Sequence, residues 1–144
     1  MREILFRGKE KTTGNWAVGF FVSYEDEAYI FEPSEIRKGI DIGGYLDCCQ
    51  MTEVRPETVC QFTGLYDKNG RKIFEGDIVR TKFGRLCIVR WFSSPMYSCW
   101  DLKAIETTAN LAFARPVYTD LYKKENLEIV GNIHDNPELM EEKK

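Results

Sequence analysis

The stretch QFTGLYDKNGRKIFEGDIV, from Gln61 to Val79, decides how the centre of the chain folds. It holds an Asn69-Gly70 pair between two apolar runs, and such a pair readily takes the left-handed backbone angles that a tight hairpin needs. Gly76 then interrupts the apolar run before it continues as DIVR. The stretch therefore predicts a hairpin followed by a further strand.

Short strands separated by turns are predicted on both sides of this hairpin. Gly14 and Gly84 mark two of the turns, and Pro33 ends one strand because proline cannot donate a ladder hydrogen bond. Residues 34–51 contain three glycines and are interpreted as a loop with short extended pieces. The predicted strands are residues 3–7, 16–22, 28–32, 52–55, 71–83 with a break at 75–77, 85–92, 99–105 and 126–134.

The end of the chain, DNPELMEEKK, is typical of a short helix. Asp135 and Asn136 are residue types that cap helices, Pro137 suits the first helical position, and glutamates follow in the first turn. Aromatic residues make up 13% of the sequence and pack well on pleated surfaces. The predicted class is therefore mainly β with a short C-terminal helix.

Composition and charge exclude several broad classes of protein. The formal net charge is -3 and the pI is about 5.3, which argues against non-specific nucleic-acid binding. The first residues do not read as a signal peptide, and the longest apolar run is far shorter than a membrane span. We therefore expect a cytoplasmic protein with no membrane partner.

The five cysteines are Cys48, Cys49, Cys60, Cys87 and Cys99. No two have the C-x-x-C spacing of a zinc or redox site, and the odd number does not suit a disulfide framework. Nothing basic flanks the Cys48-Cys49 pair to lower a thiol pKa. We expect reduced, largely buried thiols.

The carboxylates Asp67, Glu75 and Asp77 are the first candidate chemical site. A metal or acid–base cluster is one interpretation, and hydrogen bonding of turn amides is the other. No histidine lies nearby, so the structural interpretation is favoured. The only histidine, His134, follows a predicted strand with no adjacent serine or cysteine, so the sequence predicts no enzyme, no metal and no cofactor.

A basic and aromatic cluster is the second candidate. Between Arg71 and Arg90 the sequence has six basic and two acidic residues, a local balance of +4. Cations that hold a nucleic-acid backbone beside rings that stack on bases would form a binding face. The alternative is that the rings are core and the cations are the outer side of two strands. The candidate binding residues are Arg71, Lys72, Arg80, Lys82, Arg85, Arg90, Trp91 and Trp100.

Three parts of the chain together resemble one family. VRPETVCQFTGLYDKNGRKIFEGDIV in the centre, LEIVGNIHDNPELM near the end and MREILFRGK with GNWAVGFFV at the start are similar to the YopX family of phage and prophage proteins. The resemblance implies a small β-rich protein of a Gram-positive bacterium or its phage. It carries no agreed molecular function and no catalytic residue.

The resemblance and the strand pattern together suggest two subdomains. Residues 1–55 are expected to form an N-terminal β-rich subdomain. Residues 56–144 are expected to form an SH3-like small barrel with the C-terminal helix, because a strand after Gly76, a turn at Gly84 and a strand ending near Trp91 could close with residues 127–133. Closure would remove exposed strand edges.

Two functional hypotheses follow, and an enzyme that pairs His134 with a cysteine or a carboxylate is a third, less favoured one. The first is a non-enzymatic phage or prophage accessory protein that acts through protein–protein contact and forms a homo-oligomer, with host or phage proteins as further partners, because aromatic residues are enriched at interfaces. The second is a nucleic-acid-binding module that uses the basic and aromatic face, although the net charge disfavours it.

Overall fold

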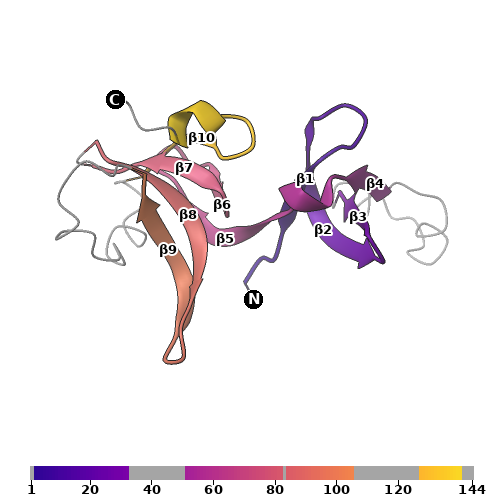
Figure 1. Ribbon diagram of the computed structural model, residues 1–144, viewed down its shortest axis with the longest axis horizontal. Helices are drawn as coiled ribbons and strands as arrows, with labels where there is room; N and C mark the ends of the chain where they lie inside the picture. The colour runs from indigo at the N-terminus through magenta and orange to yellow at the C-terminus, as the bar shows by residue number, and fades with distance from the viewer. Residues whose placement is uncertain (1, 33–50, 83, 106–126, 141–144) are drawn as a thin grey trace. The chain divides into compact units, whose positions relative to one another are not determined.

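The computed structural model describes residues 2–32, 51–82, 84–105 and 127–140. Antiparallel strands dominate these residues, and the only helical turns among them are 3-10 turns at Pro56–Thr58 and Pro137–Met140. The predicted mainly β class is therefore confirmed. The contacts within the chain divide it into two units, Met1–Phe62 and Thr63–Lys144 (Figure 1).

The first unit is one antiparallel sheet. Its strands are β1 (Phe6–Lys9), β2 (Trp16–Tyr24), β3 (Glu27–Phe31), β4 (Met51–Val54) and the beginning of β5 (Cys60–Tyr66), in the spatial order β4-β3-β2-β1-β5. The tight turn between β2 and β3 brings Tyr24 opposite Glu27, and Phe20 pairs with Phe31 at the other end. The strands β1 to β4 thus follow one another in the sheet in the order in which they occur in the sequence.

This sheet curls until its first and fourth strands meet at one end. A bridge joins Glu10 to Val54, and the amide of Arg55 donates to the carbonyl of Lys9 at 2.8 Å. A small core fills the inner side of the curl and consists of Ala17, Ala28, Ile30 and Val54, with Phe6, Phe21 and Val59 partly buried against it. The opposite, outer side of β2 therefore faces away from this core.

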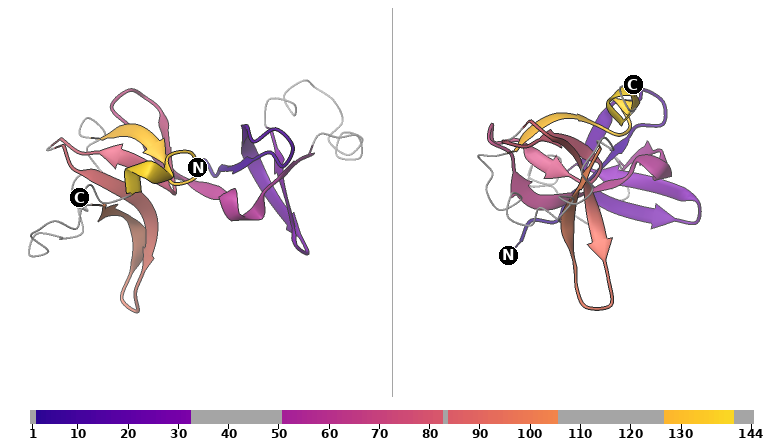
Figure 2. Two further views of the ribbon diagram at one scale, coloured as in Figure 1. Left: turned by 45° about the horizontal axis from the view of Figure 1, so that its top comes forward. Right: turned by 60° about the vertical axis from the view of Figure 1, so that its left-hand side comes forward.

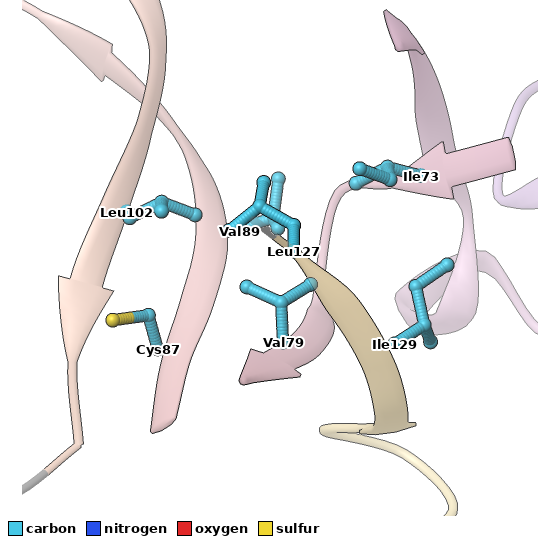
Figure 3. Packing of buried hydrophobic residues seen from close by; sticks show 7 residues of the cluster. All are labelled: Ile73, Val79, Cys87, Val89, Leu102, Leu127 and Ile129. Atoms are coloured by element: carbon cyan, nitrogen blue, oxygen red, sulfur yellow. The ribbon is translucent and has the colours of Figure 1, made fainter. Parts of the chain in front are cut away.

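The second unit contains the end of β5, β6 (Lys72–Phe74), β7 (Asp77–Arg80), β8 (Leu86–Ser93), β9 (Ser98–Ala104) and β10 (Glu128–Asn132). Four of these strands form an antiparallel sheet in the order β10-β7-β8-β9. β5 and β6 form a hairpin that contributes to the core of this unit. The core consists of Ile73, Val79, Cys87, Val89, Leu102, Leu127 and Ile129 (Figure 3).

Two turns of the second unit share one hydrogen-bond pattern. In the turn from Asp67 to Arg71 the first amide donates to the last carbonyl at 2.8 Å, and the turn from Thr81 to Arg85 repeats this at 2.9 Å. The fourth residue of each turn is a glycine with positive φ, which only glycine adopts without strain. The predicted turns are confirmed, but Gly70 alone takes the left-handed angle that was predicted for the Asn69-Gly70 pair.

The finer architectural predictions have different outcomes. Among the described residues, β10 and β9 end the four-stranded sheet without pairing to each other, so the SH3-like barrel stays a prediction. The contact boundary falls within β5, whereas the sequence placed it after residue 55, and whether either part folds alone also stays a prediction. Residues 34–50 of the predicted loop, and residues 141–144 of the predicted helix, lie outside the described residues.

Candidate interaction surfaces

Residues 79–82, at the end of β7, alternate as expected. Val79 and Thr81 are buried, whereas Arg80 and Lys82 are exposed on the other side of the strand. This is the pattern in which the cations form the outer side of a strand that packs on the core. It matches the structural interpretation of these residues.

Several of these cations lie close to partners within the chain. Arg80 lies 3.9 Å from the carboxylate of Glu128, and Lys72 lies 5.6 Å from the ring centroid of Tyr66. Arg90 forms an ion pair at 3.1 Å with Asp101, a residue that is only 3% exposed. Their charge is thus partly balanced within the protein.

The sheet also separates the predicted cations from the predicted rings. Arg71 lies in the β5–β6 turn, and Lys82 and Arg85 lie in the turn before β8. Trp91 lies near the opposite end of β8, about 20 Å from Arg85 at ~3.3 Å per residue.

The two tryptophans form a pair of their own. Trp91 lies directly opposite Trp100 on β9, and their rings meet edge to face with centroids 5.0 Å apart. Arg90, the neighbour of Trp91 in the strand, points to the other side of the hairpin because successive side chains alternate. The eight predicted binding residues therefore do not share one face, and their role in nucleic-acid binding stays a prediction.

The carboxylates of the central stretch hold backbone amides, as the structural interpretation expected. Asp67 Oδ1 accepts hydrogen bonds at 2.9 Å from the amides of Asn69 and Arg71, and Asp77 Oδ2 accepts one at 2.8 Å from Phe74. Within the described ranges, no cluster of three or more His, Cys, Asp and Glu side chains has the geometry to hold a metal ion. The sequence did not predict that Asp67 Oδ2 also accepts from the amide of Ile129.

His134 lies in a turn, and three of the five cysteines lie in strands. The amide of His134 donates at 3.0 Å to Asn132 Oδ1 in the turn after β10, and its side chain is half-buried. Cys60 and Cys87 are buried, and Cys99 is half-buried. Cys48 and Cys49 lie outside the described residues.

An apolar strip on the outer side of β2 is a feature that the sequence did not single out. Alternate residues of this strand point away from the small core, and most are strongly exposed: Val18 by 37%, Phe20 by 46%, Val22 by 41% and Tyr24 by 69%. Trp16 begins the same row. We call the row Trp16, Val18, Phe20, Val22 and Tyr24 the β2 strip.

The two ends of the β2 strip carry opposite charge. At its beginning, Arg7 and Lys9 lie over the ring of Trp16, with the guanidinium carbon 4.5 Å and the ammonium nitrogen 5.4 Å from its centroid. At its end, the exposed turn to β3 holds Glu25, Asp26 and Glu27. The strip is therefore an apolar row between a basic end and an acidic end.

Neighbouring polar groups on this side of the sheet are paired. The hydroxyl of Tyr29 donates to Glu27, and this hydrogen bond raises the pKa of the phenol to about 12. Lys11 and Glu53 form an ion pair at 2.8 Å, which raises the pKa of Lys11 above its usual value. Glu25 and Asp26 therefore remain as the acidic end of the strip, opposite the basic end at Arg7 and Lys9.

The β2 strip could not be identified from the sequence because both sides of the strand are largely apolar. In WAVGFFVSY the inner residues Ala17, Gly19 and Phe21 alternate with apolar outer residues, so no polar period identifies an exposed side. A row of exposed apolar residues along one strand could have been predicted only once the inner side was known.

Comparison with known proteins places the chain in a family. A family model described as "YopX protein" matches residues 6–141. Among solved structures, the chain is similar to protein EF1440 from Enterococcus faecalis, with 24% sequence identity, a TM-score of 0.48, and coverage of 98% of this chain and 100% of that one. Comparison with curated proteins finds no match. Because the family model spans nearly the whole sequence, the chain belongs to the YopX family.

Proposed function

We propose that the protein is a non-enzymatic accessory protein of the phage or prophage type that acts by protein–protein contact, and that it associates with copies of itself through the β2 strip. The observation that supports this is the exposed apolar row that runs from a basic end to an acidic end. Host or phage proteins are further partners in this proposal, and the cytoplasm is its location.

The distribution of charge supports a second copy as the occupant of the strip. When two identical strips pack face to face with their strands antiparallel, a two-fold axis places the basic end of each against the acidic end of the other. The strip is about 26 Å long at ~3.3 Å per residue, so both charged ends meet while the apolar residues cover one another. An interface of this kind has an apolar centre and a charged rim.

Paired charge reversals test this arrangement directly. The double variant Arg7→Glu, Lys9→Glu makes both ends of the strip acidic, and Glu25→Lys, Asp26→Lys makes both ends basic. We expect each variant alone to be monomeric in sedimentation equilibrium at a concentration where the wild type associates. We expect an equimolar mixture of the two to associate again, because every end then meets its opposite charge.

The apolar contact is tested by Phe20→Ser, which should abolish self-association while leaving the far-UV circular dichroism unchanged. Met140→Ser is the matched control, because that side chain has a similar exposed fraction of 42% and lies in the second unit. A wild type that stays monomeric at high concentration would exclude the proposal. So would a mixture of the charge variants that fails to associate.

The second hypothesis, nucleic-acid binding, predicts that single-stranded DNA binds at low salt and dissociates steeply as salt is added. The variant Arg80→Glu, Lys82→Glu should then remove the binding, because both side chains are exposed on the same side of the chain. The absence of any fluorescence anisotropy change at low salt would exclude it.

A further inference from the structure

The hairpin of β8 and β9 extends past the rest of its sheet. β7 pairs only with Leu86–Ile88 of β8, whereas β8 and β9 remain paired as far as Ser93 opposite Ser98. Among the described residues, no third strand pairs with the segment Trp91–Trp100, which we call the aromatic arm. Figures 1 and 2 show this hairpin running beyond the end of β7.

The aromatic arm is apolar and carries no charge. None of the residues in WFSSPMYSCW is charged, and the side chain at its turn, Met96, is 90% exposed. Trp91 and Tyr97 are 50% and 49% exposed. Tyr97 also packs against Phe92 with ring centroids 5.7 Å apart, so both sides of the arm carry aromatic rings.

The polar groups of the turn are hydrogen-bonded to one another. Ser94 donates its amide at 2.9 Å and its hydroxyl at 3.0 Å to the carbonyl of Tyr97, and the Ser94 hydroxyl accepts from the amides of Met96 and Tyr97 at 3.3 and 3.2 Å. Ser93 and Ser98 share a hydrogen bond at 2.8 Å. Pro95, between Ser94 and Met96, has no amide hydrogen that would need an acceptor. The backbone N–H groups of the turn therefore have hydrogen-bond partners within the turn.

Charge begins again at the base of the arm. Arg90 and Asp101, which directly flank it, are paired with each other at 3.1 Å, and Arg90 also lies over the ring of Phe92 at 5.9 Å. Lys103, two residues further along β9, is exposed. The base thus carries two cations and one buried anion.

We propose that the aromatic arm inserts its turn into the interfacial layer of a lipid bilayer. The amides of Ser94, Met96 and Tyr97 have acceptors within the turn, and insertion at the headgroup level leaves the open edges of the arm in contact with headgroups and water. Tryptophan and tyrosine favour the headgroup level, where an apolar ring and a polar atom are both accommodated. Arg90 and Lys103 lie where lipid phosphates would be.

The internal hydrogen bonding favours lipid over a protein pocket as the occupant. Protein interfaces contain about one hydrogen bond per 100–200 Å² of buried surface, and the amides of Ser94, Met96 and Tyr97 and the hydroxyl of Ser94 already donate within the turn. The inference is compatible with the finding that no helix of the described residues is long and apolar enough to cross a bilayer. The predicted absence of a membrane partner considered only spans, and shallow insertion requires none.

Vesicle flotation with the full chain tests the proposal. Flotation uses the wild-type chain as its background, and Trp16→Phe is added for the fluorescence readout alone, so that Trp91 and Trp100 are the only tryptophans that emit. We expect the wild-type chain to float with phosphatidylcholine vesicles, and the Trp16→Phe variant to shift its emission to shorter wavelength and to be quenched by brominated acyl chains. Met96→Asp should weaken partitioning about tenfold or more, because a carboxylate is costly to place in the bilayer. Met140→Asp is the matched control and should partition as the background does.

Three results would overturn the proposal. The first is no flotation with either phosphatidylcholine or mixed phosphatidylcholine–phosphatidylglycerol vesicles. The second is an equal effect of Met96→Asp and Met140→Asp. The third is an emission shift that occurs without vesicles, depends on protein concentration and disappears in Met96→Asp. Such a shift would mean that the arm binds a pocket on another protein molecule. Each is independent of the charge reversals that test the β2 strip.

Discussion

Asp67 connects parts of the second unit that are far apart in the sequence. Its carboxylate is 1% exposed and accepts three backbone hydrogen bonds, two from its own turn and one, at 3.1 Å, from Ile129 on β10. The carbonyl of Leu127 accepts from the amide of Lys68 at 2.9 Å and joins the same two segments. The role of Asp67 in its own turn could be predicted from the local sequence. Its hydrogen bond to β10 could not, because β10 is far away in the sequence.

Replacing Asp67 with asparagine should destabilise the second unit. An asparagine side chain has one acceptor oxygen, so it cannot serve both the turn amides and Ile129, and a buried amide without a partner costs about 1–3 kcal/mol. Urea denaturation followed by circular dichroism measures the loss. Glu138→Gln, an exposed acid-to-amide change in the same unit, should change stability by less than about 0.5 kcal/mol. Equal midpoints for both variants would contradict this role for Asp67.

Tyr29 should give the first unit a stability that declines at high pH. Its pKa is raised from 10.0 to about 12, first by the hydrogen bond to Glu27, then by desolvation and by the nearby negative charges. Because the folded pKa lies above the unfolded one, the contribution is complete below about pH 10 and is lost as the pH rises towards 12. The difference between the ultraviolet titrations of wild type and Tyr29→Phe isolates this phenol. In Glu27→Gln the same difference titration should move back towards 10, and an unchanged curve would show that the hydrogen bond is not the cause.

At the scale of elements, the sequence predicted turns better than surfaces. Gly70 and Gly84 were identified because a left-handed backbone angle is a local requirement that the residue itself reveals. The outer exposure of Phe20 was not identified, because it depends on which side of β2 meets Ile30 and Val54, and β4 comes from a distant part of the chain. The bridge from Glu10 to Val54 was unpredictable for the same reason.

The candidate site shows the same limit. Alternation correctly placed Arg80 and Lys82 on the exposed side of the chain. Composition could not show that Arg90 is paired with Asp101, because the partner lies on the next strand. Grouping residues by nearness in sequence therefore joined cations and rings that the sheet places on different sides and at different ends.

Gly19 should be essential to the pairing of β2 with β3. A Cβ atom added there would lie 1.6 Å from the carbonyl oxygen of Phe31, and a backbone atom in a sheet cannot move aside as a flexible side chain can. We expect Gly19→Ala to destabilise the first unit by roughly 3 kcal/mol. Thermal or urea unfolding measures this change. Ser23→Ala, at an exposed position of the same strand, should have little effect, and comparable stability of the two variants would show that the sheet can relax around the methyl group.

At the scale of the whole molecule, each of the two units has a hydrophobic core among its described residues. One is built around Ile30 and Val54 inside the curled sheet, and the other around Ile73 and Val89 in the second unit. β5 belongs to both units, since the boundary lies between Phe62 and Thr63. Two cores joined by one continuous strand raise the question of whether the units unfold together.

Matched core truncations answer that question. Ile30 and Ile73 are both fully buried, one in each core, and Ile→Val at either position should cost about 0.5–1.5 kcal/mol through the lost methylene and the small cavity. If each core stabilises its own unit, Ile30→Val should accelerate hydrogen exchange in peptides from β2 and β3 and leave β7 and β8 unchanged. Ile73→Val should do the reverse, because subglobal unfolding exposes only the weakened unit. Mass spectrometry in mild denaturant resolves these peptides, and equal acceleration throughout the chain in both variants would show instead that β5 couples the two cores into one cooperative unit.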